Sequence, residues 1–413
     1  MQKFIYCPKN LILFCYKNYK KEYFYAIILN MDKKIIYLDS ASTTKVNKTV
    51  LTEMLPYFSE KYGNANSLHQ IGQICNKAIA NSRETIAKDF NCKPNELFFT
   101  SCGSEANNWA IKGYALANKN KGNHIIISAI EHDSILESAK FLKSIGFNIS
   151  YVKPQKDGHV NVSSIEKLIT NKTILISVMA VNNETGCIQP IEDISKIARK
   201  NNIAYHVDFV QALSQFVPNV KKIRPNLLTI SSHKIHGPKG IGLLYIKHGT
   251  HIIDLLDGGS QEFGKRAGTS NTPLIVGFAK AIEINCNNRI NNTNYYKKLN
   301  YLFLSTLKNN GIDYIINGCQ PKVENILNIS FPNIDAEGLL HILDEKGICI
   351  SVGSACNSTN KKPSHVLKSM GISLSIINSS VRISFDEFIS EDDIIYSANV
   401  ISDTIKTIKK MKG

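Results

Sequence analysis

Short apolar runs alternate with helix-length amphipathic stretches between about residue 95 and residue 250. The runs are ELFFT (96–100), HIIIS (124–128), ILISVMAV (174–181), IAYHV (203–207), LLTISS (227–232) and IGLLYI (241–246). Apolar runs of this length between amphipathic helices are typical of buried strands in βαβ units. The pattern therefore predicts an α/β fold with a largely parallel sheet.

The spacing of apolar residues changes after about residue 290. A helix is indicated by Leu299, Leu302, Phe303 and Leu307, which are followed by Gly311, and a strand is indicated by ILNISF (326–331). A final helix is indicated by Ile394, Ala398, Ile401 and Ile405, with Ser390 as its N-cap. We expect a smaller α+β domain here.

Composition excludes some classes of protein. No apolar run in the 413 residues reaches the roughly 18 residues of a membrane span, so we expect no membrane-spanning role. The 10 cysteines form no CxxC pair, which indicates a reducing compartment and neither a zinc site nor a disulfide framework.

A net charge of +15 fits either an acidic partner such as RNA or a solvated surface. We favour the surface, because no nucleic-acid motif accompanies the charge.

Residues 1–30 differ from the rest of the chain, being aromatic and basic, and Met31 follows them. Three interpretations remain open: an upstream start codon that is not used, a degenerate organelle-targeting segment, and a flexible extension. We expect a cytoplasmic protein, with a mitochondrion or a mitochondrion-derived organelle as the alternative if this segment targets the chain.

Lys234 lies in SSHKIHGPKG (231–240), directly after an apolar run. A lysine at the mouth of a buried strand is a candidate Schiff-base nucleophile, because burial disfavours the ammonium form and lowers the pKa of the amine. An isolated lysine beside a Gly-Pro turn is more often a solvated surface charge. The segment alone does not decide between these interpretations.

Other polar residues follow the predicted strands, where ligands of α/β folds gather. Gly103 and Ser104 would present N–H groups and a hydroxyl to a phosphate at a helix N-terminus, or Ser104 is an ordinary N-cap. Asp208 could hold a protonated pyridine nitrogen or bind loop amides. His132 could stack on such a ring and transfer protons, or be a satisfied polar residue.

Cys356 lies in ISVGSACNSTNKKP (350–363), a run of small and polar residues that predicts an exposed loop. Exposure is what a reactive thiol requires. Cys187 and Cys349 have apolar neighbours and are expected to be small core residues.

In this order the segments resemble the pyridoxal-phosphate-dependent cysteine desulfurases of the NifS/IscS-like class, within the fold-type I aminotransferase superfamily. The resemblance runs from about residue 35 to residue 405. It rests on YLDSASTTKV (37–46), YGNANSLHQIG (62–72), TSCGSEANN (100–108), EHDSILES (131–138), VNNETG (181–186), HVDFVQ (206–211), SSHKIHGPKGIG (231–242), KRAGTSN (265–271), NILNISF (325–331), GSAC (353–356) and SSVRISF (379–385).

The resemblance implies a role for each candidate residue. Lys234 would bind pyridoxal 5'-phosphate covalently, Asp208 would pair with its ring nitrogen, and His132 would stack on its ring. Asn183 and Gln211 would lie near its phenolic oxygen, and Asn183 would also contact the substrate. The phosphate would be held by Gly103, Ser104, Ser231 and His233, and by Thr269 of a second subunit, which implies a homodimer. Arg382 would bind the substrate carboxylate, a task that suits a guanidinium.

The resemblance also implies the reaction and the architecture. L-Cysteine would become L-alanine, leaving a persulfide on Cys356 that supplies sulfur to an iron–sulfur scaffold protein and to other acceptors, such as those of tRNA thiolation. The family fold implies a large cofactor-binding domain over 46–290, with a mainly parallel seven-stranded sheet. It implies a small α+β domain made of 31–45 with 291–413, which carries the cysteine loop.

Departures from the family pattern at Phe209, Val352 and Glu324 are expected to alter local packing more than chemistry. Many members of the family continue past the last helix into a tail that contacts the iron–sulfur scaffold, whereas this sequence ends at KKMKG. We therefore do not expect docking to a scaffold through such a tail. The alternatives are a selenocysteine lyase or a related pyridoxal-phosphate enzyme, and a catalytically silent scaffold that only binds sulfur acceptors.

Overall fold

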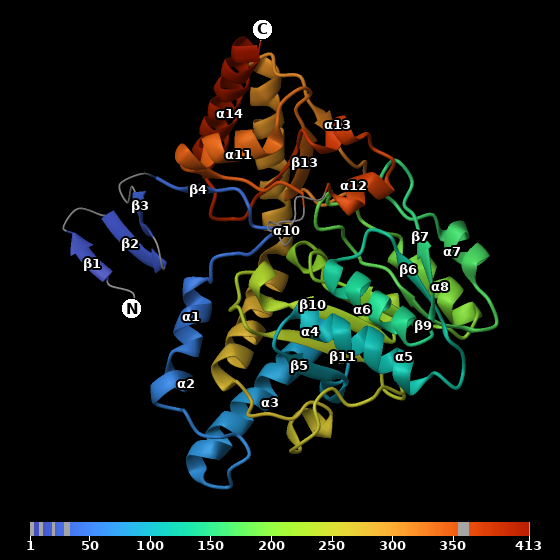
Figure 1. Cartoon of the computed structure of the whole chain (residues 1–413). Coiled ribbons are helices and arrows are strands. Elements are labelled where there is room, and N and C mark those ends of the chain that lie inside the picture. The colour runs from blue at the N-terminus through green and yellow to red at the C-terminus, as the bar shows by residue number, and fades with distance from the viewer. Residues whose placement is uncertain (1–3, 8–10, 19–20, 29–33, 354–362, 413) are drawn as a thin grey trace.

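A seven-stranded sheet forms the centre of the larger part of the molecule in the computed structural model, which describes residues 4–7, 11–18, 21–28, 34–353 and 363–412 (Figure 1). The strand order is β5-β11-β10-β9-β8-β6-β7. Only β11 runs antiparallel to its neighbours in this sheet. The strands are β5 (Leu97–Thr100), β6 (His124–Ser128), β7 (Asn148–Val152), β8 (Thr173–Ser177), β9 (Ala204–Asp208), β10 (Leu227–Ser231) and β11 (Gly242–Ile246).

The six apolar runs all contain strands, so the prediction of a mainly parallel sheet is confirmed. Strand β8 ends at Ser177, four residues before the end of the predicted run, because the Met179 N–H turns away to donate to the Glu131 side chain at 2.7 Å. Strand β7 lies at the edge of the sheet with mostly exposed or half-buried side chains. It therefore has no continuous apolar run in the sequence.

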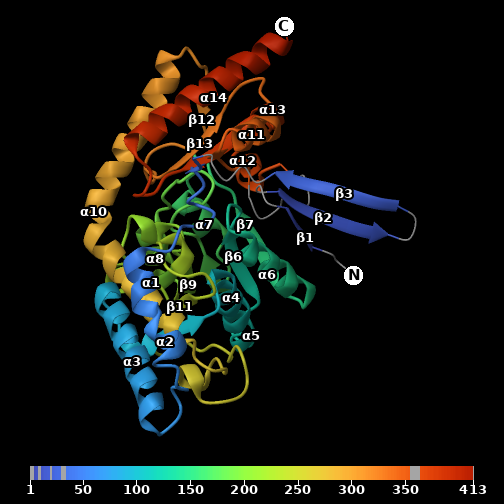
Figure 2. The ribbon, with the colours of Figure 1, turned by 90° about the vertical axis from the view of Figure 1, so that its left-hand side faces the viewer.

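Helices pack on both faces of this sheet, with α3 and α10 against each other on one side and α6 on the other (Figure 2). These helices are α1 (Lys48–Met54), α2 (Pro56–Ser59), α3 (Gln70–Phe90), α4 (Gly103–Asn108), α5 (Tyr114–Ala117), α6 (Asp133–Ser144), α7 (Val162–Leu168), α8 (Ile191–Lys200), α9 (Val220–Ile223) and α10 (Thr272–Asn309). Short turns of 3₁₀ or π helix are η1 (Pro94–Glu96), η2 (Trp109–Gly113), η3 (Ala212–Ser214), η4 (Ser232–Lys234) and η5 (Gln261–Gly264).

The carboxyl-terminal part forms a smaller α+β layer above the sheet in Figure 1. Its strands are β12 (Ile315–Ile316), β13 (Ile326–Ser330) and β15 (Ser380–Ser384), paired antiparallel, and β14 (Ile348–Cys349), which pairs in parallel with β4 (Ile36–Tyr37). Its helices are α11 (Ala336–Glu345), α12 (His365–Ser369), α13 (Leu374–Ile377) and α14 (Glu391–Lys412). Ser390 accepts from the Asp393 N–H at 3.1 Å, which confirms it as the cap of α14.

Two of the four hydrophobic cores among the described residues relate to the proposed division into domains. The smaller core contains Ile36, Leu38 and residues between Tyr296 and Ile405. The larger core packs along the sheet and contains Phe209, but it also takes in Val366 and Leu367. Two further cores, around Ile125 and around Trp109, pack on other residues of the same sheet. Helix α10 runs through position 290 without a break, so a rigid rod connects the two proposed domains.

At the amino-terminal end, β1 (Phe4–Cys7), β2 (Leu11–Asn18) and β3 (Lys21–Ile28) pair antiparallel in a sheet of their own. Across the described helices, we find none that combines the length and the apolar composition of a membrane span.

Candidate active site

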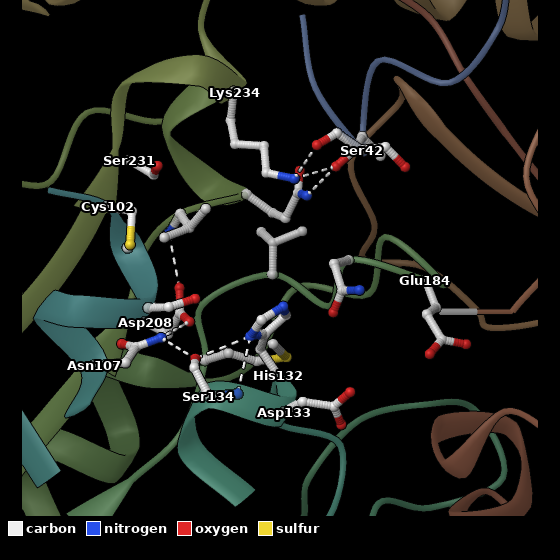
Figure 3. A pocket seen from close by; sticks show the side chains of 18 of the residues that line it. Ser42, Cys102, Asn107, His132, Asp133, Ser134, Glu184, Asp208, Ser231 and Lys234 are labelled. Atoms are coloured by element: carbon white, nitrogen blue, oxygen red, sulfur yellow. Dashed lines mark hydrogen bonds between the residues drawn. The ribbon is translucent and has the colours of Figure 1, made fainter. Parts of the chain in front are cut away.

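A cavity of about 410 Å³ lies at the carboxyl ends of strands β8, β9 and β10 (Figure 3). Among the described residues, its lining includes all the site residues predicted from the sequence except Thr269: Gly103, Ser104, His132, Asn183, Asp208, Gln211, Ser231, His233, Lys234 and Arg382. Segments from both proposed domains therefore meet at one cavity.

Lys234 reaches the cavity from η4, the turn that follows strand β10. Its Nζ donates to the backbone oxygens of Ala41 at 2.6 Å and Ser42 at 2.7 Å. Gln211 donates to the same Ala41 oxygen at 2.8 Å. The segment between β4 and α1 thus holds the Lys234 amine at the cavity. These contacts join residues that lie nearly 200 positions apart in the chain.

Asp208 is buried at the end of strand β9. Its Oδ1 accepts from the Val210 N–H at 2.9 Å, and its Oδ2 accepts from Asn107 Nδ2 at 2.8 Å. Asn107 was not singled out from the sequence, although it lies on α4 four residues after Gly103. Both carboxylate oxygens are held, so the group presents a fixed negative charge to the cavity.

His132 precedes helix α6 and caps it, because its Nδ1 accepts from the Ser134 N–H at 3.1 Å. A ring nitrogen that accepts from an N–H carries no proton. The proton of the neutral ring therefore sits on Nε2. The Ser134 hydroxyl, 2.9 Å from Nδ1, also accepts from Asn107, which links His132 to the partner of Asp208.

The phosphate-binding candidates gather where helix α4 begins. Ser231 Oγ is buried and has no hydrogen-bond partner among the described residues. A Cβ on Gly103 would lie 3.2 Å from Val210 Cγ2 and 3.3 Å from the Ser231 Cβ, so a larger residue would crowd this approach. Burial and the charges of Lys234 and Lys239 lower the pKa of His233 to about 4, so this ring is neutral at physiological pH.

The N-cap of helix α4 is Cys102 and not Ser104. Cys102 Sγ accepts from the Glu105 N–H at 3.4 Å, while Ser104 is exposed and lines the cavity. The interpretation of Ser104 as an ordinary cap is therefore wrong, since the cap lies two residues earlier.

Arg382 enters the cavity from strand β15 with a nearly buried side chain. Its Nη2 donates to Asp39 Oδ1 at 2.7 Å and to Ser42 Oγ at 2.6 Å, and its Nη1 donates to the Asn183 backbone oxygen at 3.1 Å. The Nε–H is buried without a partner among the described residues. Asp39, which sequence reasoning missed, therefore sets the orientation of the guanidinium.

Glu131 and Glu184 are two further buried acids to which the sequence assigned no role. Burial and the nearby charge of Asp208 raise the pKa of Glu131 to about 8. Glu184 lies in the cavity wall, and its Oε2 accepts from the hydroxyl of Ser364. Their only sequence signal was their place inside EHDSILES and VNNETG.

Cys356 lies outside the described residues, but the chain on either side of its segment meets the cavity. Ser351 exchanges two backbone hydrogen bonds with Arg382, and Ser364 is bonded to Glu184. His365 Nε2 donates to the Glu131 backbone oxygen at 3.0 Å. Thr269 is exposed and does not line this cavity.

These features fit pyridoxal phosphate. The cavity offers an amine for the aldehyde, a held carboxylate for the ring nitrogen, and an unpartnered buried hydroxyl on Ser231 for the phosphate.

Comparison with known proteins agrees with this geometry. The aminotransferase class-V family matches residues 36–396. A cysteine desulfurase IscS of Clostridium botulinum strain Hall is 43% identical over 381 residues, covering 92% of this chain and 96% of the relative.

Solved structures agree as well. One described as a NifS-like protein is 37% identical with a TM-score of 0.85 and covers 90% of this chain and 100% of its own. Another, SspA in complex with cysteine, is 34% identical with a TM-score of 0.77 and covers 85% of this chain and 98% of its own. The chain belongs to the aminotransferase class-V family and is, within it, a pyridoxal-phosphate-dependent cysteine desulfurase of the NifS/IscS-like class.

Proposed function

We propose that Lys234 holds pyridoxal phosphate through its amine while Asp208 binds the ring nitrogen and His132 covers the ring. Gly103, Ser104, Ser231 and His233 bind the phosphate, and Asn183 and Gln211 lie beside the phenolic oxygen. The observation that carries this assignment is the convergence of these residues, from distant parts of the chain, on one cavity with an unpartnered Ser231 hydroxyl.

Substrate binding follows from the charges of the cavity. Arg382 binds the carboxylate of L-cysteine, with Asp39 holding one edge of the guanidinium and the buried Nε–H still to be satisfied. The Lys234 amine would hold the cofactor and, when not bonded to it, would move the proton at the substrate Cα. The bound cofactor supplies the electron withdrawal that weakens the bonds of the substrate.

Cys356 receives the sulfur. Its thiolate attacks the substrate sulfur, so an S–S bond forms, the C–S bond breaks, and the former side-chain carbon is protonated to give alanine. The product on the protein is a persulfide. Support comes from Ser351 and Ser364, which flank the segment of Cys356 and are both bonded to residues of the cavity.

Substitution of Cys356 by Ser tests this role. We expect the variant to retain the absorption of the bound cofactor and its change on addition of L-cysteine, while alanine release and persulfide formation fall at least about 100-fold, as is typical when a nucleophile is removed. Mass spectrometry of peptides after incubation with L-cysteine locates the persulfide. Cys349→Ser is the matched control, and persulfide formation in Cys356→Ser at the wild-type rate would contradict the proposal.

A homodimer completes the site in this proposal, with Thr269 of the partner subunit binding the phosphate. The exposed position of Thr269, away from the cavity of its own chain, supports this arrangement. The persulfide then passes to an iron–sulfur scaffold protein and to other acceptors such as those of tRNA thiolation. We place this activity in the cytoplasm.

A further inference from the structure

His236 is a buried histidine that the proposed reaction does not use, although it follows Lys234 by only two residues. Its backbone φ of 61° lies in the left-handed region, which residues other than glycine adopt rarely. Two backbone contacts hold it there. Its N–H donates to Thr44 Oγ1 at 2.8 Å, and its carbonyl oxygen accepts from the Asn47 N–H at 2.9 Å. The structure therefore maintains an uncommon backbone conformation beside the lysine.

Both nitrogens of the His236 ring face hydrogen-bond acceptors. Nδ1 lies 2.9 Å from the backbone oxygen of Lys45, and Nε2 lies 2.9 Å from Glu387 Oε2. The same Glu387 oxygen also accepts from the Tyr296 hydroxyl at 3.0 Å. An imidazole whose two nitrogens both donate is the protonated form, so this ring carries a positive charge.

The surroundings of the two side chains favour a charged pair. Burial lowers the pKa of His236, but the hydrogen bond and charge of Glu387, with the charge of Asp386, outweigh burial and raise it above its ordinary value. Burial raises the pKa of Glu387, but the hydrogen bond and charge of His236 outweigh it, so the pKa is lowered. His236 and Glu387 therefore form an ion pair that is largely shielded from water.

This ion pair joins the two parts of the chain that carry the ends of the proposed substrate site. His236 belongs to the proposed large domain and directly follows the turn of Lys234. Glu387 belongs to the proposed small domain and follows strand β15, which carries Arg382. The second acceptor, Lys45, ends the segment of the small domain that lines the cavity.

The segment around Glu387 is itself fixed against the ring. Asp386 accepts from the Ser40 hydroxyl at 2.9 Å and from the Phe388 N–H at 2.9 Å. The Phe388 ring meets the His236 ring edge to face, with 4.9 Å between the ring centroids. A shift of His236 would therefore be felt by the chain that continues from Arg382.

Lys234 also contacts the small domain, but through the amine that is proposed to bond the cofactor. That amine donates to the backbone oxygens of Ala41 and Ser42 (Figure 3). An amine bonded to an aldehyde carbon keeps at most one N–H, so it cannot donate a separate proton to each oxygen. The contacts of His236 do not use this amine and are independent of that change.

We propose that His236 is a positioning residue, whose ion pair with Glu387 sets Arg382 at the distance from the Lys234 amine that one amino-acid substrate spans. This inference rests on the proposed function, because it uses the roles of Lys234 and Arg382. A displacement of about 1 Å between two such groups costs up to about 100-fold.

L-Alanine and ethylamine test the proposal, because they carry the same amine and methyl group and only L-alanine has a carboxylate. Neither has a thiol, so neither can be desulfurated. Their dissociation constants for the holoenzyme are measured from the change in absorption of the bound cofactor. We expect wild type to prefer L-alanine, because it alone contacts both ends of the site.

Two variants remove the ion pair. Glu387→Gln keeps the shape of the side chain, and His236→Asn keeps a residue that tolerates the left-handed conformation. We expect each to reduce the preference for L-alanine by about 10-fold or more, while the affinity for ethylamine stays close to that of wild type. An unchanged preference, an equal loss of affinity for both ligands, or loss of the cofactor from both variants would overturn the proposal.

Glu391→Gln is the matched control, since it breaks the ion pair of Glu391 with Lys298, at 2.6 Å, inside the small domain. Its preference for L-alanine should equal that of wild type. A reduction as large as that of Glu387→Gln would show a general effect of lost ion pairs and would also overturn the proposal.

Arg382→Gln separates this inference from the proposed function. It should lose the preference for L-alanine with His236 and Glu387 intact. If Arg382→Gln keeps the preference, or wild type has none, the proposed role of Arg382 fails. If Arg382→Gln loses the preference and the two ion-pair variants keep it, only the role of His236 fails.

Discussion

At the scale of single residues, several groups in the cavity are held in position by a partner elsewhere in the chain. Asp208 is held by Asn107, and Lys234 by the backbone of Ala41 and Ser42. Such partners keep a reactive side chain in one rotamer, which a binding site for a covalently held cofactor requires.

Glu131 has a pH-dependent effect on stability. Its pKa is about 8 in the folded protein and 4.5 as the ordinary value. From about pH 4.5 to pH 8 the folded state therefore holds a proton that the unfolded chain has lost, so this contribution to stability decreases as pH rises.

We expect Glu131→Gln, which keeps an acceptor for Ser128 and for the Met179 N–H, to remove this contribution. The melting temperature of wild type should then fall more steeply between about pH 5 and pH 8 than that of the variant. Thermal melts of both proteins across this range check it. Glu137→Gln, an exposed position on α6, is the control, and equal slopes for wild type and Glu131→Gln would contradict the prediction.

At the scale of elements, strand β11 supports the loop that opens helix α4. Gly242 pairs with Thr100 and with Ser231, and a Cβ on it would lie 2.6 Å from the Cys102 carbonyl carbon. No real Cβ contact is that short, so any larger residue must displace the backbone beside Gly103.

We expect Gly242→Ala to weaken binding of pyridoxal phosphate by about 10-fold or more, because overpacking of about 1–3 kcal/mol falls on the loop that binds the phosphate. Equilibrium titration of the apoprotein with the cofactor measures the change. Gly338→Ala on α11 is the matched control, since its nearest neighbour would be the side chain of Asp335 at 3.0 Å. The same affinity in both variants would show that the backbone accommodates the Cβ.

At the scale of the whole molecule, the stretch from α1 to the start of α3 exposes several large apolar side chains. Helices α1 and α2 and the start of α3, which lie together at one side of the molecule in Figure 1, expose Leu51, Leu55, Phe58, Tyr62, Leu68, Ile71 and Ile74. Leu68 is 93% exposed. Exposed apolar patches of this kind are typical of subunit interfaces, which supports the proposed homodimer.

If the proposed homodimer forms through this stretch, we expect Leu68→Glu combined with Phe58→Glu to give a monomer and to weaken cofactor binding, because Thr269 of the partner subunit would be lost from the phosphate. Sedimentation and cofactor absorption measure the two effects. Tyr396→Glu on α14 is the control for a charge added at an exposed aromatic residue elsewhere. A variant that remains dimeric would argue against this stretch as the interface.

Much of the fold could be predicted, because its signals are local. Continuous apolar runs mark strands that are buried on both faces, and the polar residues at their carboxyl ends, such as Asp208 and Lys234, do line the cavity. The edge strand β7 escaped prediction because its exposed side chains leave no such run. The alternative that placed the N-cap of α4 at Ser104 was wrong, because the thiol of Cys102 accepts the hydrogen bond that a hydroxyl more often accepts.

The sequence by itself predicted six of the seven strands of the sheet, the family and ten residues that line the cavity, because each of these signals lies in a short stretch of the chain. Only the tertiary structure decided which distant groups pair. Arg382 meets Asp39 across 343 positions, Ser364 meets Glu184 across 180, and Asn107 meets Asp208 across 101. These contacts arise from the packing of separate segments around one cavity, and no local pattern of residues encodes them.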